Sequence, residues 1–139
     1  MPAEDMRYEH RTSFRYDGMP LDLSDTFVIE IPAGIGTCAD LLETYATRGR
    51  FPEYFGGNFN ALRDCLCDFD WVSAQTIVIA HADVPLTDAI DAAAYLRLLA
   101  DVLQLWLRFD LHDVVVVFPA DERATIVMLL AAPYAAPGS

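Results

Sequence analysis

Three short runs of β-branched and aromatic residues limit what this chain can fold into. They are Thr26 to Pro32, Thr76 to Ala82 and Asp113 to Phe118. Each run is typical of a buried strand, and the near-continuous apolar character of the second suits a parallel sheet that is covered on both faces. Parallel strands need crossover connections, which helices usually supply. The pattern therefore predicts an α/β fold with a small parallel sheet.

Helical signals fill the gaps between these runs. A helix is expected from Thr37, a good N-cap residue, to about Arg48, with Gly49 as its stop. A second helix is expected from Asn58 to about Asp68. A third should begin at Thr87 or Asp88 and continue to about Phe109. One apolar stripe of the second helix should face the core, and it consists of Phe59, Leu62, Leu66 and Phe69.

The length of the chain indicates a single domain. A sequence of 139 residues that is 54% hydrophobic can bury one core, with its centre expected at residues 26–118. In the flanking extensions, Arg7 to Tyr16 could add a strand, and Thr125 to Leu130 could return as a strand after the turn Pro119 to Arg123. The predicted fold class is α/β, with a three-stranded parallel sheet flanked by helices and room for extra terminal strands.

The charge of the chain restricts its partners. All nine basic residues are arginine, against 21 carboxylates, and the formal net charge is -12 with a pI near 4.3. Such a field repels the phosphates of nucleic acids and of anionic membranes. It attracts a basic protein over a long range. We therefore expect a basic protein partner, and neither direct nucleic-acid binding nor membrane binding.

The sequence also suggests a compartment. Its longest uncharged apolar stretch, Ala124 to Ala136, is shorter than the ~20 residues that a membrane-spanning helix needs. Met1 to Glu9 has acidic residues where a signal peptide carries positive charge. The three cysteines lack the spacing of a metal site and are expected to be reduced thiols. The expected location is the cytoplasm.

Catalytic apparatus is scarce in this sequence. The glycine-rich segments lack both the dinucleotide-binding spacing and a phosphate-loop lysine. The histidines are scattered, and each is expected to be solvated or hydrogen-bonded rather than catalytic. The best enzymatic hypothesis is an acid/base pair made by Asp64 and Asp68, but these residues have no evident pocket. We expect no enzymatic activity, no cofactor and no metal. The histidines are His10, His81 and His112.

Residues 51–66, which read FPEYFGGNFNALRDCL, form the most specific motif of the chain. A proline, aromatic residues and paired glycines lead to an Asn, an Ala-Leu step and an Asp. This segment closely resembles the signature of the barstar family, whose members are intracellular inhibitors of ribonucleases. The order of strands and helices from Thr26 to Phe118 also fits that family. The resemblance implies a barstar-like fold and the stoichiometric blockade of a basic ribonuclease by the loop and the helix after it.

The expected helix could present such an inhibitory surface. Asn60, Asp64 and Asp68 are spaced four residues apart, so they project from one helix face, away from the apolar stripe. A carboxylate matches the arginine and lysine groups with which a nuclease binds phosphate. We therefore expect Asp64, in the middle of this face, to be the main contact. Asp68 is a weaker candidate, because an acid at a helix C-terminus opposes the dipole.

The loop before the helix supplies further candidates for partner binding. Tyr54 is expected to be an aromatic contact of the kind that anchors interfaces, or to pack against its own loop. Gly56 and Gly57 should provide positive φ and a tight entrance to the helix. Asn58 should act first as the N-cap and second as an interface residue.

Three positions differ from the pattern of the best-known family member. Asn60 stands where that member has a second interface aspartate, and Arg63 stands where it has a tryptophan. Both differences make the surface less acidic. The family also uses a glutamate near the end of its last helix, and Asp110 is the only acid near that place. The partner-binding set implied by the resemblance is Tyr54, Gly56, Asn58, Asn60, Arg63, Asp64, Asp68 and Asp110.

The sequence leaves three functions open. The first is inhibition of a basic ribonuclease. The second is an immunity or adaptor role, in which the chain binds another basic toxin or a non-nuclease protein. The third is a carboxylate-dependent hydrolase that uses Asp64, Asp68 or Asp110. The identity of the partner, its affinity and the effect of Asn60 and Arg63 on its choice are not encoded in any motif.

Overall fold

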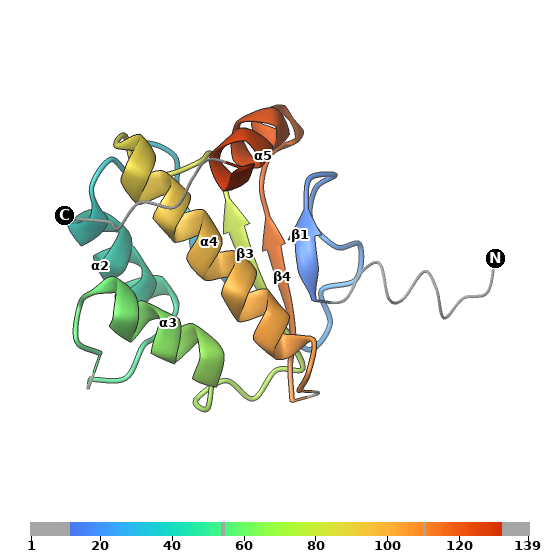
Figure 1. Cartoon of the computed structure of the whole chain (residues 1–139). Helices are drawn as coiled ribbons and strands as arrows, with labels where there is room; N and C mark the ends of the chain where they lie inside the picture. The colour runs from blue at the N-terminus through green and yellow to red at the C-terminus, as the bar shows by residue number, and fades with distance from the viewer. Residues whose placement is uncertain (1–11, 54, 110, 132–139) are drawn as a thin grey trace.

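A computed structural model describes residues 12–53, 55–109 and 111–131 of the chain (Figure 1). The described part contains four strands, four helices and one short 3-10 turn, η1. In chain order these elements are β1 (Ser13–Arg15), β2 (Thr26–Ile31), α2 (Cys38–Arg48), α3 (Phe59–Asp68), β3 (Thr76–His81), α4 (Ala89–Trp106), β4 (Asp113–Val117), η1 (Ala120–Glu122) and α5 (Arg123–Ala131).

The strands form one parallel sheet in the order β1-β4-β3-β2. Ile29 of β2 pairs with Ile79 of β3, which in turn pairs with Val116 of β4. The α/β fold class and the three predicted strands are confirmed. The three predicted helices are also present, although α4 ends at Trp106, earlier than Phe109.

One layer of helices covers one face of the sheet. Figure 1 shows α2, α3 and α4 lying across this face. Alternate residues of the strands point toward these helices, because successive side chains of a strand face opposite sides of the sheet. The fully buried core between the layers includes Ile29, Ile31, Leu62, Leu66, Ile77, Ile79, Leu96 and Leu99.

The fourth strand, β1, comes from the N-terminal segment for which the sequence left open whether it forms a strand. In the described part of the segment Arg7 to Tyr16, residues 12–16, Ser13–Arg15 forms β1, at the edge beside β4. Because β1 and β2 lie at opposite edges, residues 16–25 must cross the sheet. Met19 in this crossover packs on Val78 and Val115, which are fully buried on the face that the helices leave open. The crossover therefore helps to cover that second face.

The C-terminal segment Thr125 to Leu130 is helical, and the alternative of a returning strand is wrong. It belongs to α5, which continues directly from η1 after Pro119. Its β-branched residues favour strands locally, but the helix buries Ile126 and packs against α4. Tertiary packing therefore overrides local propensity here. Within the residues described, no helix is both long and apolar enough to span a bilayer.

Candidate functional site

Aromatic rings fix the loop that precedes α3. The rings of Phe51 and Phe55 meet edge to face with their centroids 5.0 Å apart. The ring of Phe51 also lies 5.4 Å from that of Trp71, whose indole N–H donates a hydrogen bond of 2.9 Å to the carbonyl of Gly49. These contacts hold the apolar side of the loop against the core. Tyr54, between the two phenylalanines, lies outside the described residues.

A glycine and an N-cap residue set the direction in which α3 leaves this loop. Gly57 has φ +68°, which favours glycine. Asn58 is extended, and its side-chain oxygen accepts a hydrogen bond of 2.7 Å from the backbone N–H of Ala61. The expectation of positive φ at Gly56 is wrong, because only Gly57 of the pair adopts it. A Cβ on Gly56 would make ordinary contact with Ala61, at 3.6 Å.

Helix α3 has a buried face and an exposed face, as its sequence predicts. Leu62 and Leu66 are fully buried, and the indole N–H of Trp106 on α4 donates a hydrogen bond of 2.8 Å to the carbonyl of Leu66. Phe69 ends the helix in a left-handed conformation with its ring fully buried. The exposed residues of α3 are Asn60, Arg63, Asp64 and Asp68. The packing of α3 therefore turns the predicted partner-binding side chains outward.

An ion pair joins this exposed face to α4. The Arg63 guanidinium and the Asp101 carboxylate approach to 3.2 Å, with 52% and 54% of their side chains exposed. Sequence reasoning missed Asp101. The only available signal was that it lies off the apolar stripe of its helix. We call the set Asn60, Arg63, Asp64, Asp68 and Asp101 the acidic surface. Asp110, the candidate from the end of the last helix, lies outside the described residues.

Three charged residues of the acidic surface, Arg63, Asp64 and Asp101, all influence the pKa of the Cys67 thiol and are therefore close together. Burial raises the pKa of Cys67 most, Arg63 lowers it, and Asp64 and Asp101 raise it. The pKa of Cys65 is also raised, first by burial and then by Asp68 and Asp64. Both thiols are therefore held in the protonated form, which is a poor nucleophile and a poor metal ligand. In the described part of the chain, no cluster of side chains is arranged to hold a metal ion.

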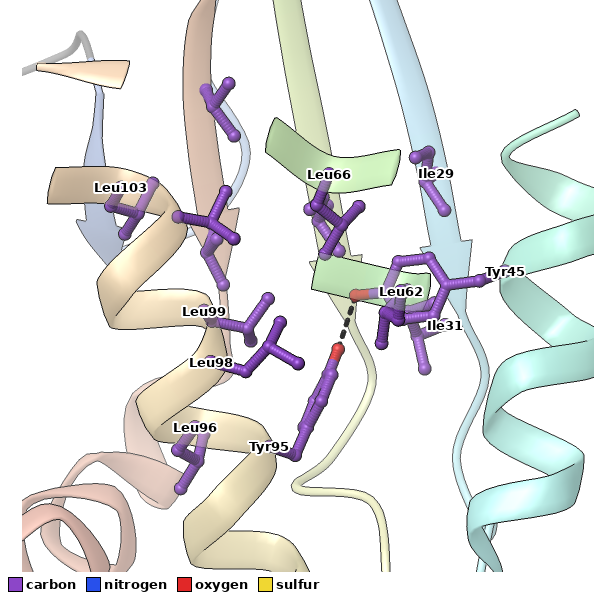
Figure 2. Packing of buried hydrophobic residues seen from close by; sticks show 14 of the residues in the cluster. Ile29, Ile31, Tyr45, Leu62, Leu66, Tyr95, Leu96, Leu98, Leu99 and Leu103 are labelled. Atoms are coloured by element: carbon purple, nitrogen blue, oxygen red, sulfur yellow. Dashed lines mark hydrogen bonds between the residues drawn. The ribbon is translucent and has the colours of Figure 1, made fainter. Parts of the chain in front are cut away.

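A buried chain of polar side chains lies in the core beneath the acidic surface. Figure 2 shows the hydroxyl groups of Tyr45, on α2, and Tyr95, on α4, meeting in a hydrogen bond. The hydroxyl of Tyr95 also lies 2.6 Å from Nε2 of His81, at the end of β3. The ring of Phe59, in the first turn of α3, lies 6.4 Å from that of Tyr95. These hydrogen bonds link α2 and α4 to the end of β3. They therefore stiffen the base on which α3 rests.

The acidic surface is suited to binding another surface. Four of its five side chains, all except Asp101, point out of the molecule from α3, which is held at both ends, by Asn58 at its start and Phe69 at its end. Exposed carboxylates on a rigid support can receive charge-assisted hydrogen bonds from arginine or lysine side chains of a partner.

A comparison with models of protein families finds one match, described as barstar (barnase inhibitor), over residues 26–126. The match includes the loop, α3 and the whole of α4. Neither the curated proteins nor the solved structures contain a significant match to the chain.

Proposed function

Because the chain belongs to the barstar family, we propose that it is a stoichiometric protein inhibitor of a basic ribonuclease. The observation that carries the proposal is the exposed position of Asp64 in the middle of α3, next to Arg63, which forms an ion pair with Asp101 on α4. The family is one of inhibitors, described by its action on barnase. The function proposed for this chain is accordingly to bind and block without turnover.

The proposed mechanism is competition for the cations that hold RNA phosphates. A ribonuclease active site uses arginine and lysine side chains to bind phosphate, and a carboxylate offers them an alternative anion with matching geometry. On docking, Asp64 would occupy such a position, with Asp68 and Asn60 one turn to either side of it on the same face. RNA and the inhibitor would then exclude each other.

Rigid presentation supports this mechanism. The N-cap at Asn58, the ring contacts of Phe51 and the hydrogen bond from Trp106 fix the loop and α3 before a partner arrives. Little conformational freedom is then lost on association, which favours tight binding. Within the loop, Gly56 is exposed beside the start of α3 and leaves room for the partner to approach. We include Tyr54 and Asp110 in the proposed interface on the family resemblance alone.

The charge of the chain supports the proposed type of partner. A net charge of -12 attracts a basic protein and repels the RNA on which that protein acts. We therefore propose that the chain binds the nuclease rather than its substrate, and that it does so in the cytoplasm.

A second candidate is an immunity or adaptor protein for a different basic toxin. It is favoured by Asn60 and Arg63, because each makes the surface less acidic than a surface built from carboxylates alone. The two candidates share the acidic surface and differ in the target. Comparing binding to barnase and to basic toxins that are not nucleases would separate them.

Titration of RNA cleavage tests the main proposal. Barnase at a fixed concentration is mixed with increasing amounts of the protein, and the initial rate of cleavage is measured with a fluorogenic RNA substrate. We expect the rate to fall linearly and to reach its minimum near one equivalent. In the absence of barnase, the protein should cleave no RNA. Undiminished cleavage at a large excess of protein would argue against the proposal, as would turnover by the protein itself that is lost in Asp64→Ala.

A further inference from the structure

Arg63 places a positive charge inside the acidic surface. It directly precedes Asp64 on α3, and its Nη1 atom lies 3.2 Å from Oδ2 of Asp101 on α4. Arg63, Asp64 and Asp101 all act electrostatically on the thiol of Cys67. The three charges therefore form one cluster around the thiol of Cys67.

The ion pair is not what holds these two helices together. Both side chains are about half exposed, and pairs of this kind typically contribute ~0–1 kcal/mol to stability. The helices are joined instead by buried side chains such as Leu62 and by the hydrogen bond from Trp106 to the carbonyl of Leu66. The main effect of Arg63 is therefore on whatever approaches the surface.

A docked partner would strengthen the effect of this charge. Covering the surface removes water, so a cation placed to pair with Asp64 or Asp101 would be repelled by the neighbouring guanidinium. A carboxylate on the partner would instead be attracted. The contact with Asp101 engages one nitrogen of Arg63, and a guanidinium has further N–H donors to offer.

We propose that Arg63 determines the choice of partner: it disfavours a ribonuclease whose cleft is cationic throughout, and it favours one that presents a carboxylate to Arg63 beside the cations that pair with Asp64. Specificity of this kind arises from the repulsion of wrong partners as much as from attraction to the right one. The inference rests on the proposed inhibitory function and adds the chemistry of the target surface to it.

Arg48 provides a matched control for the test. It lies at the end of α2 and forms a similarly exposed ion pair with Glu30 of β2, at 3.7 Å and with 47% and 72% of the side chains exposed. Arg63→Met and Arg48→Met remove the same charge and leave an unbranched side chain. A difference between them therefore reports the local repulsion and not the field of the whole molecule. Arg63→Lys keeps the charge and changes only the shape.

The experiment measures the dissociation constants of barnase for wild type and the three variants at one salt concentration, with circular dichroism as the folding control. We expect Arg63→Met to bind at least about tenfold more tightly than wild type, a change of ~1.4 kcal/mol. Arg48→Met and Arg63→Lys should stay within about twofold. Equal effects of Arg63→Met and Arg48→Met would overturn the inference and leave the inhibitory function standing. Absence of barnase binding by wild type and by every variant would contradict inhibition of barnase-type ribonucleases, and the inference with it.

Discussion

Nε2 of His81 and the hydroxyl of Tyr95 form a hydrogen bond of 2.6 Å in the core, and the other ring nitrogen, Nδ1, lies 3.1 Å from the carbonyl of Val117. A carbonyl only accepts, so Nδ1 carries the proton and Nε2 accepts from Tyr95. Tyr95 has one hydroxyl proton and gives it to His81, so Tyr45 must donate to Tyr95. Each of the three buried side chains, Tyr45, Tyr95 and His81, thus has a defined role as donor or acceptor in these hydrogen bonds.

Burial of His81 predicts a loss of stability in mild acid. Burial lowers the pKa of His81 to about 3, whereas the unfolded chain should titrate near the ordinary value of 6.5. Between these values only the unfolded state binds the proton, so the free energy of unfolding is at its full value above about pH 6.5 and falls as pH decreases. We expect a loss of ~2 kcal/mol between pH 7.5 and pH 5. Urea unfolding at several pH values measures it.

His81→Gln is the control for this prediction. An amide can keep a donor toward Val117 and an acceptor toward Tyr95, but it does not titrate. Its stability should therefore depend less on pH in the same window, whatever its absolute value. The other titrating groups are common to both proteins and cancel in the difference. Parallel curves for wild type and His81→Gln would show that His81 does not set the acid response.

The order of donors predicts unequal effects of two single-atom deletions. Tyr95→Phe leaves the Tyr45 hydroxyl and Nε2 of His81 without partners, and it should cost ~2–6 kcal/mol, since each buried unsatisfied group costs ~1–3 kcal/mol. Tyr45→Phe leaves the bond from Tyr95 to His81 intact and should cost only ~0.5–1.5 kcal/mol. Urea unfolding at pH 7.5 compares the two variants. Equal losses would mean that the proton order is not the one deduced from the Val117 carbonyl.

Periodicity in the sequence was sufficient to predict the centre of the fold. The apolar runs and N-cap residues placed β2, β3, β4 and three helices to within a few residues, because burial and capping act locally along the chain. The first and last elements of the fold were harder to predict. Residues Ser13–Arg15 become a strand only by pairing with β4, which is far away in the sequence. Thr125 and Ile126 favour strands locally, yet α5 forms because it packs on α4.

The acidic surface could be predicted from the sequence only for those residues that lie on a single helix. The spacing of Asn60, Asp64 and Asp68 placed all three on one exposed face, as the structure shows. Asp101 could not be foreseen, because it reaches this surface only when α4 packs beside α3. The link from His81 to Tyr95 has the same origin, since it depends on the packing of a helix against a strand end. Contacts between elements carry no periodic signal in one sequence.

The acidity of the chain predicts the way in which salt affects binding. A net charge of -12 should steer a basic ribonuclease toward the surface, so the association rate with barnase should fall steeply as the Debye length shrinks from ~30 to ~8 Å. The dissociation rate should change less, because short-range contacts control it. Stopped-flow mixing at several salt concentrations measures both rates. An association rate that does not change with salt would point to an apolar docking mode instead.

The last prediction ranks two neighbours on the exposed face of α3, Asp64 and Asn60. Asp64 carries a charge that a partner would desolvate and pair, so Asp64→Ala should weaken barnase binding by at least ~2 kcal/mol, or about thirtyfold. Asn60 can accept a hydrogen bond but has no charge, so Asn60→Ala should cost less. Asn60→Asp restores a carboxylate one turn away and should tighten binding to a strongly basic target.

Calorimetry gives the affinities, and circular dichroism gives the folding control. All three variants should remain folded, because both positions are exposed and neither belongs to the buried side of α3 that Leu62 and Leu66 form. Loss of binding in a folded Asp64→Ala variant would then come from the surface alone. Unchanged affinity in that folded variant would mean that the motif of residues 51–66 serves the fold only, and that the partner docks elsewhere on the molecule.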